Sequence, residues 1–201
     1  MTHRLGIYLF DDVEVLDFTG PFEVFSTASR MKARLQPEAD IPFEVFTIAD
    51  TLRPVKARGG LMIQPRFDIQ NHPPIDILIV PGGVVTAELK RDPIIDWIKQ
   101  TSSRSELTAS VCTGAFLLAK AGLLQGKTVT THWEDVDDLR AMFTGFTVQT
   151  EKRWVDEGSI ITSAGISAGL DMSLHIVERI EGQELALKTA RQMDYDWHRT
   201  A

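Results

Sequence analysis

The residue best suited to chemistry is Cys112, the only cysteine among the 201 residues of the chain. It follows an apolar, strand-like run at 107–111 and precedes an alanine- and leucine-rich, helix-like run at 113–121. Backbone N–H groups and the helix dipole at such a junction favour the thiolate. This pattern, that of a nucleophile elbow, predicts a nucleophile with an increased thiolate fraction at neutral pH. The alternative is an inert cysteine packed at the end of a strand.

Two glycines form a second candidate feature. Gly82 and Gly83 follow Pro81 at the end of an apolar run at 76–80. Consecutive backbone N–H groups at such a turn can stabilise developing negative charge, as in an oxyanion hole. A tight turn with no role in binding explains the same pattern.

Asp17 lies between Leu16 and Phe18 at the entry to the first expected helix. Beside a thiol, a carboxylate positions water or transfers a proton. Alone, it is better explained as a carboxylate stabilised by the helix dipole. We therefore expect Asp17 to matter for chemistry only if the fold brings it to Cys112.

Two more positions follow expected strands. Gly165, in the small-residue segment 163–169, gives close backbone access to a cleft, whereas Ser167 in the same segment suits a helix cap. His132 precedes an expected helix and can face the same cleft, or can be a capping or packing residue beside Trp133. Neither signal is specific without the others.

Strand-like and helix-like segments alternate along the chain. Strands or extended segments are expected at 5–10, 43–49, 55–64, 76–80, 107–111, 127–131, 148–149 and 154–162, and helices at 18–30, 93–101, 113–121, 133–143, 167–180 and 184–194. This alternation predicts an α/β fold with a doubly wound, mostly parallel sheet and helices on both faces. Ligands of such sheets bind beyond the carboxyl ends of the strands, where Cys112, Gly82 and Gly83 fall. We expect a single domain over residues 1–201.

Composition excludes several classes of protein. The net charge of −7 disfavours nucleic-acid and anionic-membrane partners. No apolar run is long enough for a membrane span, and a single cysteine suits the reducing cytoplasm. The spacing of histidine, cysteine and carboxylate residues predicts no metal site, and no phosphate-loop or dinucleotide fingerprint implies a cofactor.

Together these motifs resemble the ThiJ/PfpI superfamily, which has a class I glutamine-amidotransferase-like, flavodoxin-like fold. The segments that carry the resemblance are 16–25 (LDFTGPFEVF), 80–83 (VPGG), 110–115 (SVCTGA), 130–133 (TTHW) and 161–169 (ITSAGISAG). The most similar subgroup contains isonitrile hydratases and the sensor domains of AraC-type regulators. The hydratases have a cysteine followed by threonine and an aspartate at the first strand–helix junction, which Cys112, Thr113 and Asp17 match.

The resemblance implies an isonitrile hydratase-type lyase that converts a small uncharged isonitrile and water to an N-substituted formamide. Cys112 would attack the isonitrile carbon, Asp17 would handle water or a proton, and the N–H groups of Gly83 and Thr113 would stabilise charge. Two alternatives stay open, which are a stand-alone ligand-sensing domain and a thiol stress or redox protein. Family members are mostly dimers, so a homodimer is also implied.

Overall fold

The computed structural model describes residues 1–199 and has a central sheet with the strand order β10-β11-β7-β6-β1-β2-β5. The strands of this sheet are β1 (His3–Leu9), β2 (Phe43–Ala49), β5 (Phe67–Asp68), β6 (Ile77–Val80), β7 (Leu107–Val111), β10 (Trp154–Asp156) and β11 (Ile160–Ser163). All neighbours pair in parallel except β10, which runs antiparallel to β11. All residues of β6 and β7 are buried, as expected for central strands covered on both faces.

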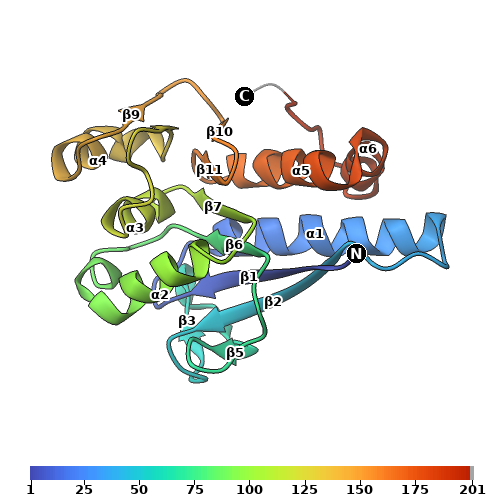
Figure 1. The fold of residues 1–201 in the computed structure, drawn as a ribbon, viewed down its shortest axis with the longest axis horizontal. Coiled ribbons are helices and arrows are strands. Elements are labelled where there is room, and N and C mark those ends of the chain that lie inside the picture. The colour runs from blue at the N-terminus through green and yellow to red at the C-terminus, as the bar shows by residue number, and fades with distance from the viewer. Residues whose placement is uncertain (200–201) are drawn as a thin grey trace.

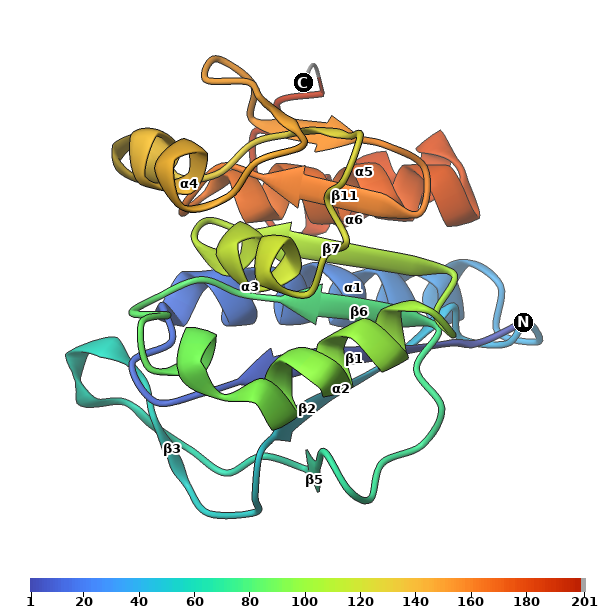
Figure 2. The ribbon, with the colours of Figure 1, turned by 60° about the vertical axis from the view of Figure 1, so that its left-hand side comes forward.

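Helices cover both faces of this sheet. They are α1 (Val15–Leu35), α2 (Asp92–Ser102), α3 (Gly114–Lys120), α4 (Val136–Met142), α5 (Ala168–Glu181) and α6 (Gln183–Gln192). In Figures 1 and 2, α2 and α3 lie on one side of the sheet, and α1, α5 and α6 lie on the other. The structure thus confirms the doubly wound α/β fold that the alternating pattern predicts.

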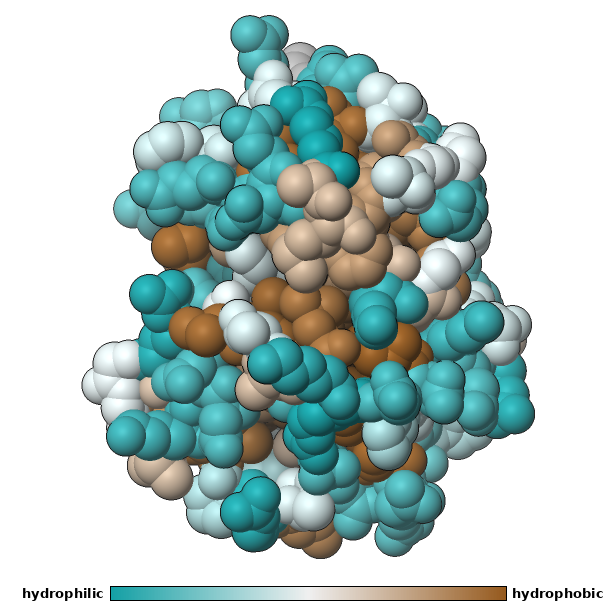
Figure 3. All heavy atoms as spheres, turned by 90° about the vertical axis from the view of Figure 1, so that its left-hand side faces the viewer, coloured by the Kyte–Doolittle hydropathy of each residue, from teal (hydrophilic) through white to brown (hydrophobic). Residues whose placement is uncertain are grey.

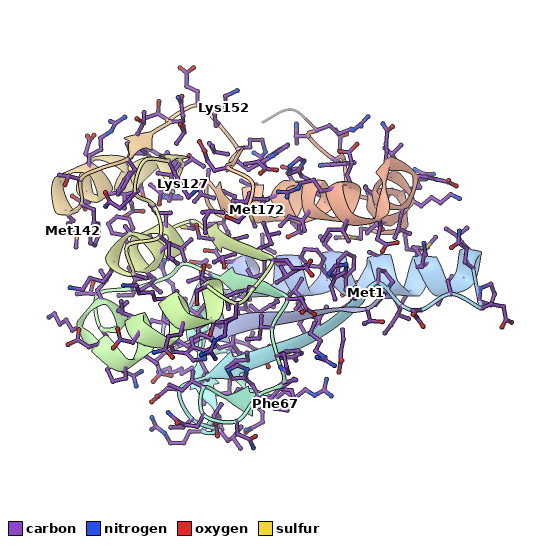
Figure 4. All side chains as sticks on the ribbon, in the orientation of Figure 1. Met1, Phe67, Lys127, Met142, Lys152 and Met172 are labelled. Carbon is purple, nitrogen blue, oxygen red and sulfur yellow. The ribbon has the colours of Figure 1, made fainter. Side chains whose placement is uncertain are left out.

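The core forms where these layers meet. Leu174 and Val177 of α5 are fully buried, whereas Leu170 and Ile180 are partly buried against the core. Met172, also fully buried, lies on the side of α5 that faces the sheet (Figure 4). The apolar residues that recur at helical spacing along α5 therefore belong largely to the core.

The first helix begins earlier than its sequence indicates. It begins at Val15 rather than Phe18, and Pro21 lies inside it rather than in its first turn. Thr19 donates from Oγ1 to the carbonyl of Val15, 2.7 Å away, within the helix. The longer helix places Asp17 in its own first turn.

The region between β7 and β11 also differs from expectation. The predicted strand at 127–131 is reduced to β8 (Thr128–Val129), which pairs with β9 (Thr147–Val148) outside the main sheet. The predicted helix at 133–143 splits into a 3₁₀ turn, η3 (Trp133–Asp135), and α4. Residues 130–132 are therefore a connection that passes the end of β7, because Thr131 Oγ1 donates to the Cys112 carbonyl at 2.8 Å.

The extended segment at 55–64 forms a small antiparallel hairpin, as predicted, from β3 (Val55–Lys56) and β4 (Met62–Ile63). The 3₁₀ turn η1 (Arg58–Gly60) joins these two strands. Its Arg58 N–H donates to the Val13 carbonyl at 3.0 Å, so the hairpin is attached to the loop after β1.

Parallel strands place their carboxyl ends at one end of the molecule. The chain moves from β1 to β2 in one direction and then to β6, β7 and β11 in the other, so the order reverses beside β1. Ligands of such folds bind at this switch point. Figure 3 looks at that end of the molecule and shows apolar surface surrounded by hydrophilic side chains.

No helix within residues 1–199 combines the length and apolar character that crossing a membrane requires.

Candidate active site

Cys112 occupies a sharp turn between β7 and α3. Its φ angle is 55°, in the left-handed region that side chains other than glycine rarely adopt. Such a conformation costs about 1–3 kcal/mol and persists only where the surroundings enforce it. Gly114 makes the turn possible, because a Cβ there would lie 2.1 Å from the Val80 carbonyl oxygen. The sharp strand–helix turn expected at this position is therefore present, and Cys112 is 7% exposed.

Asp17 reaches the same point from the first turn of α1 and is fully buried. Its Oδ2 accepts a hydrogen bond of 3.0 Å from the Gly82 N–H, whereas its Oδ1 has no partner within residues 1–199. Burial raises the pKa of Asp17 to about 7, although the Gly82 N–H and the adjacent Cys112 thiol act in the opposite direction. A buried carboxyl with a free oxygen and a pKa near neutrality is suited to proton transfer.

The ionisation of Cys112 differs from expectation. Burial raises the pKa of the Cys112 thiol well above its usual value, and the neighbouring Asp17 carboxylate raises it further. The backbone N–H of Thr113 lowers it, which is the expected effect of a helix start, but this effect is the smaller one. At neutral pH the cysteine is therefore a thiol, and nucleophilic attack requires a base to take its proton.

The turn after β6 and Thr113 hold this pair in place. Thr113 Oγ1 accepts from the Gly83 N–H and donates to the Gly83 carbonyl, both at 2.9 Å. The N–H groups of Gly82 and Gly83 thus bind Asp17 and Thr113 and are not open to a substrate, contrary to the predicted oxyanion hole. Gly82 is needed for close packing, since a Cβ there would lie 2.6 Å from the Thr113 nitrogen and 2.8 Å from Asp17 Oδ2.

Gly165 and His132 form another wall around the thiol. A Cβ at Gly165 would lie 2.6 Å from Cys112 Sγ and 2.7 Å from His132 Cδ2. The expected close backbone approach at Gly165 is therefore present. His132 Nδ1 lies 3.2 Å from Asp135 Oδ2, and the imidazole is mostly buried. His132 lines the pocket around Cys112 and does not cap η3 with its side chain, but its ring also lies 5.7 Å from that of Trp133, so the cleft and packing interpretations both fit.

Cys112 lies in the wall of a pocket of about 290 Å³, whose lining does not include Asp17, Gly82 or Gly165. The lining residues are Glu14, Arg58, Gly83, Cys112, Thr113, His132, Glu134, Asp135 and Ile166. Sequence reasoning missed five of them, which are Glu14, Arg58, Glu134, Asp135 and Ile166. Glu14 is partly buried and pairs with Arg58 at 3.0 Å.

Two other residues, Ser167 and His175, form side-chain contacts of their own. Ser167 precedes α5 but makes no side-chain cap, and its Oγ instead accepts from Arg153 at 3.4 Å. His175 Nε2 lies 2.8 Å from Asp156 Oδ2. Among residues 1–199, no group of three or more histidine, cysteine and acidic residues is arranged to hold a metal ion.

The fold class of this protein is a doubly wound α/β sheet, and its candidate site is a cysteine at a sharp strand–helix turn with a buried aspartate beside it. The model of the DJ-1/PfpI family matches residues 3–179, and the chain belongs to this family. The resemblance to the ThiJ/PfpI superfamily is thereby confirmed.

Relatives within the family differ in function. The chain is 31% identical over 196 residues to the isonitrile hydratase of Pseudomonas putida, covering 97% of this chain and 79% of that protein. It is 27% identical over 192 residues to the HTH-type transcriptional regulator GbdR of Pseudomonas aeruginosa, covering 96% of this chain and 50% of the regulator.

A solved structure has the same architecture. The ThiJ/PfpI family protein from Pseudomonas syringae superposes with a TM-score of 0.85 at 27% identity, covering 98% of this chain and 77% of that one.

Proposed function

We propose that this protein is a cysteine-dependent isonitrile hydratase-type lyase. The observation that carries the proposal is the pair formed by the Cys112 thiol and the adjacent, fully buried Asp17, whose Oδ1 has no hydrogen-bond partner within residues 1–199. Thr113, which follows the nucleophile, has no basic group at neutral pH, so Asp17 is the base adjacent to the thiol. The similarity to the hydratase of Pseudomonas putida supports this reaction.

In the first step, the sulfur bonds to the terminal carbon of the isonitrile. Asp17 takes the thiol proton and passes it to the same carbon, so that the carbon–nitrogen triple bond becomes a double bond. The product is a thioimidate, R–N=CH–S–Cys112, and no oxidant or cofactor is required. The Asp17 pKa of about 7 suits both parts of this transfer at neutral pH.

In the second step, water adds to the thioimidate carbon. Asp17 takes a proton from the water, and the imine nitrogen gains a proton. The carbon–sulfur bond then breaks, the carbonyl forms, and the thiol recovers its proton from the hydroxyl group. The sum is R–NC plus H₂O giving R–NH–CHO. His132, held by Asp135, is a second group beside the thiol for these proton movements.

Thr113 and the glycines have positioning roles in this proposal. Thr113 holds the turn at Gly83, and the Gly82 N–H fixes Asp17 beside the thiol. Gly165 leaves room for the adduct next to Sγ. We further propose that the enzyme works as a cytoplasmic homodimer of this single domain, on small substrates and without a cofactor.

The test is turnover of simple alkyl and aryl isonitriles by the purified protein, followed as formamide release. Cys112→Ala removes the nucleophile and is expected to abolish turnover, whereas the parent protein should also yield an adduct with the mass of protein plus isonitrile. Normal activity in Cys112→Ala would exclude the covalent mechanism.

A ligand-sensing domain is the second candidate, favoured by the match of nearly the whole chain to half of the regulator GbdR. Saturable binding of a small molecule, without turnover that depends on Cys112, would favour this candidate over the enzyme.

A further inference from the structure

The mouth of the Cys112 pocket carries an unbalanced set of charges. Three carboxylates line it, those of Glu14, Glu134 and Asp135, against a single guanidinium, that of Arg58. The Arg58 guanidinium lies 3.0 Å from Glu14, so its charge is already balanced. Glu134 and Asp135 therefore remain as the excess negative charge of this pocket.

The remaining basic group near these two carboxylates is the His132 imidazole. It lies 3.2 Å from Asp135 and 3.9 Å from Glu134. Asp135 is the closer partner and is one-third exposed, whereas the Glu134 side chain is 64% exposed and faces solvent. Even with a protonated imidazole, the two carboxylates outweigh the single positive charge.

Such an arrangement acts on any charged group that approaches the thiol. Clefts lined by charges of one sign repel ligands of the same sign and lower their local concentration. Deeper in the site, Asp17 adds negative charge whenever it is ionised. The chain as a whole, at −7, contributes in the same direction.

We propose that this pocket selects substrates by charge, rejecting anionic molecules and accepting uncharged or cationic ones, with Glu134 as a specificity-determining residue. Where the molecule is an isonitrile, this inference rests on the proposed function. The substrate class is then an isonitrile whose R group carries no carboxylate or phosphate. The charge selection itself depends only on the residues around Cys112.

The test compares two alkylating reagents of similar size, neutral iodoacetamide and anionic iodoacetate. Cys112 is the only cysteine, so intact mass reports modification at this site alone. The rate ratio of iodoacetamide to iodoacetate in the folded protein is divided by the ratio in the urea-unfolded protein, which removes the intrinsic reactivity. We expect a quotient of about 10 at low salt, falling towards 1 in 1 M salt, where the screening length is about 3 Å.

Glu134→Gln should lower this quotient about threefold, and Glu134→Lys should lower it further. The matched control is Glu44→Gln, which removes one carboxylate from β2 near the amino end of the sheet, where Glu44 pairs in register with Arg4. It should leave the quotient unchanged. A quotient near 1 in the parent protein, or an equal change in Glu44→Gln, would overturn the proposal.

A second arm uses isocyanoacetate and its neutral methyl ester as substrates. We expect kcat/KM for the ester to exceed that for the anion about tenfold at low salt, with the difference reduced in Glu134→Gln. Turnover of both at equal rates would refute charge selection and leave the proposed function standing. Turnover of neither would refute the proposed function, and the alkylation ratio would still decide the charge selection.

Discussion

Two aspartates of this protein are equally buried but differ in their hydrogen bonding. Asp17 and Asp171 are both fully inaccessible to solvent. Asp171 Oδ2 accepts from the Arg153 guanidinium at 2.6 Å, and Oδ1 accepts from the Tyr195 hydroxyl at 3.1 Å and the His198 N–H at 3.0 Å. Asp17 Oδ2 accepts a hydrogen bond from the Gly82 N–H, and its Oδ1 has no hydrogen-bond partner within residues 1–199.

The difference shows that burial alone does not identify a reactive carboxylate. Asp171 connects the segment before β10 to the segment after α6, and every interaction it makes stabilises its charge. Burial and the Asp171 charge together raise the pKa of Tyr195 to about 12, so the tyrosine stays a hydrogen-bond donor. Asp17 lacks such a partner, and its unmet hydrogen bonding is available for chemistry.

The largest expected effect is the loss of catalytic activity when Asp17 is replaced. Asp17→Asn keeps the shape of the side chain and removes the base, so kcat/KM for isonitrile hydration should fall about 10²- to 10⁴-fold. The free energy of unfolding at neutral pH should not decrease, because a neutral amide removes the cost of burying a carboxylate there. Steady-state kinetics and urea unfolding test both parts, and unchanged kcat/KM would remove Asp17 from the mechanism.

The next effect is on stability. Asp171→Asn leaves Arg153 without its carboxylate, and breaking such a buried pair costs about 3–5 kcal/mol. Because the Arg153 side chain is 35% exposed, we expect a loss near the lower end of that range, about 3 kcal/mol. Urea unfolding of this variant should therefore contrast with that of Asp17→Asn. A loss below ~1 kcal/mol would show that the network is not structural.

The smallest expected effect is on the pH dependence of stability. The pKa of Asp17 is raised in the folded state to about 7, above its ordinary value of 3.8. Between these values the folded state holds a proton that the unfolded state has lost, so stability falls as pH rises and levels off above the folded pKa. Relative to Asp17→Asn, the parent protein should therefore lose about 2 kcal/mol between pH 5 and pH 8.

Unfolding at a series of pH values measures this difference. A parallel dependence in the two proteins would show that Asp17 titrates near its ordinary value.

The local sequence pattern is sufficient to predict much of this fold. The runs at 43–49 and 107–111 are strands with the predicted bounds, because continuous apolar and β-branched residues suit buried strands. The sequence pattern does not predict those features of the fold that depend on tertiary contacts. The start of α1 and the separation of β8 from the main sheet depend on packing against distant segments, which local spacing does not encode.

The candidate site likewise has features that the sequence predicts and features that it does not. Cys112, Asp17, Gly82 and Gly165 follow strands, and topology brings strand ends together, so their meeting could be anticipated. The raised pKa of Cys112 could not, because it comes from burial and from a carboxylate 95 positions away in the chain. Arg58 was missed for a similar reason, since its hairpin reaches the pocket only through contact with the loop after β1.

The edges of the sheet have a consequence for assembly. At one edge β5 pairs over two residues, and at the other β10 pairs over three and runs against its neighbour. Such short edge strands offer few free N–H and C=O groups, but β5 pairs only with Ile48 and Ala49 and leaves the rest of β2 along this edge. Strand addition by a second molecule therefore has little backbone to pair with at β10, whereas at the other edge it would have to pair with β2 beside β5.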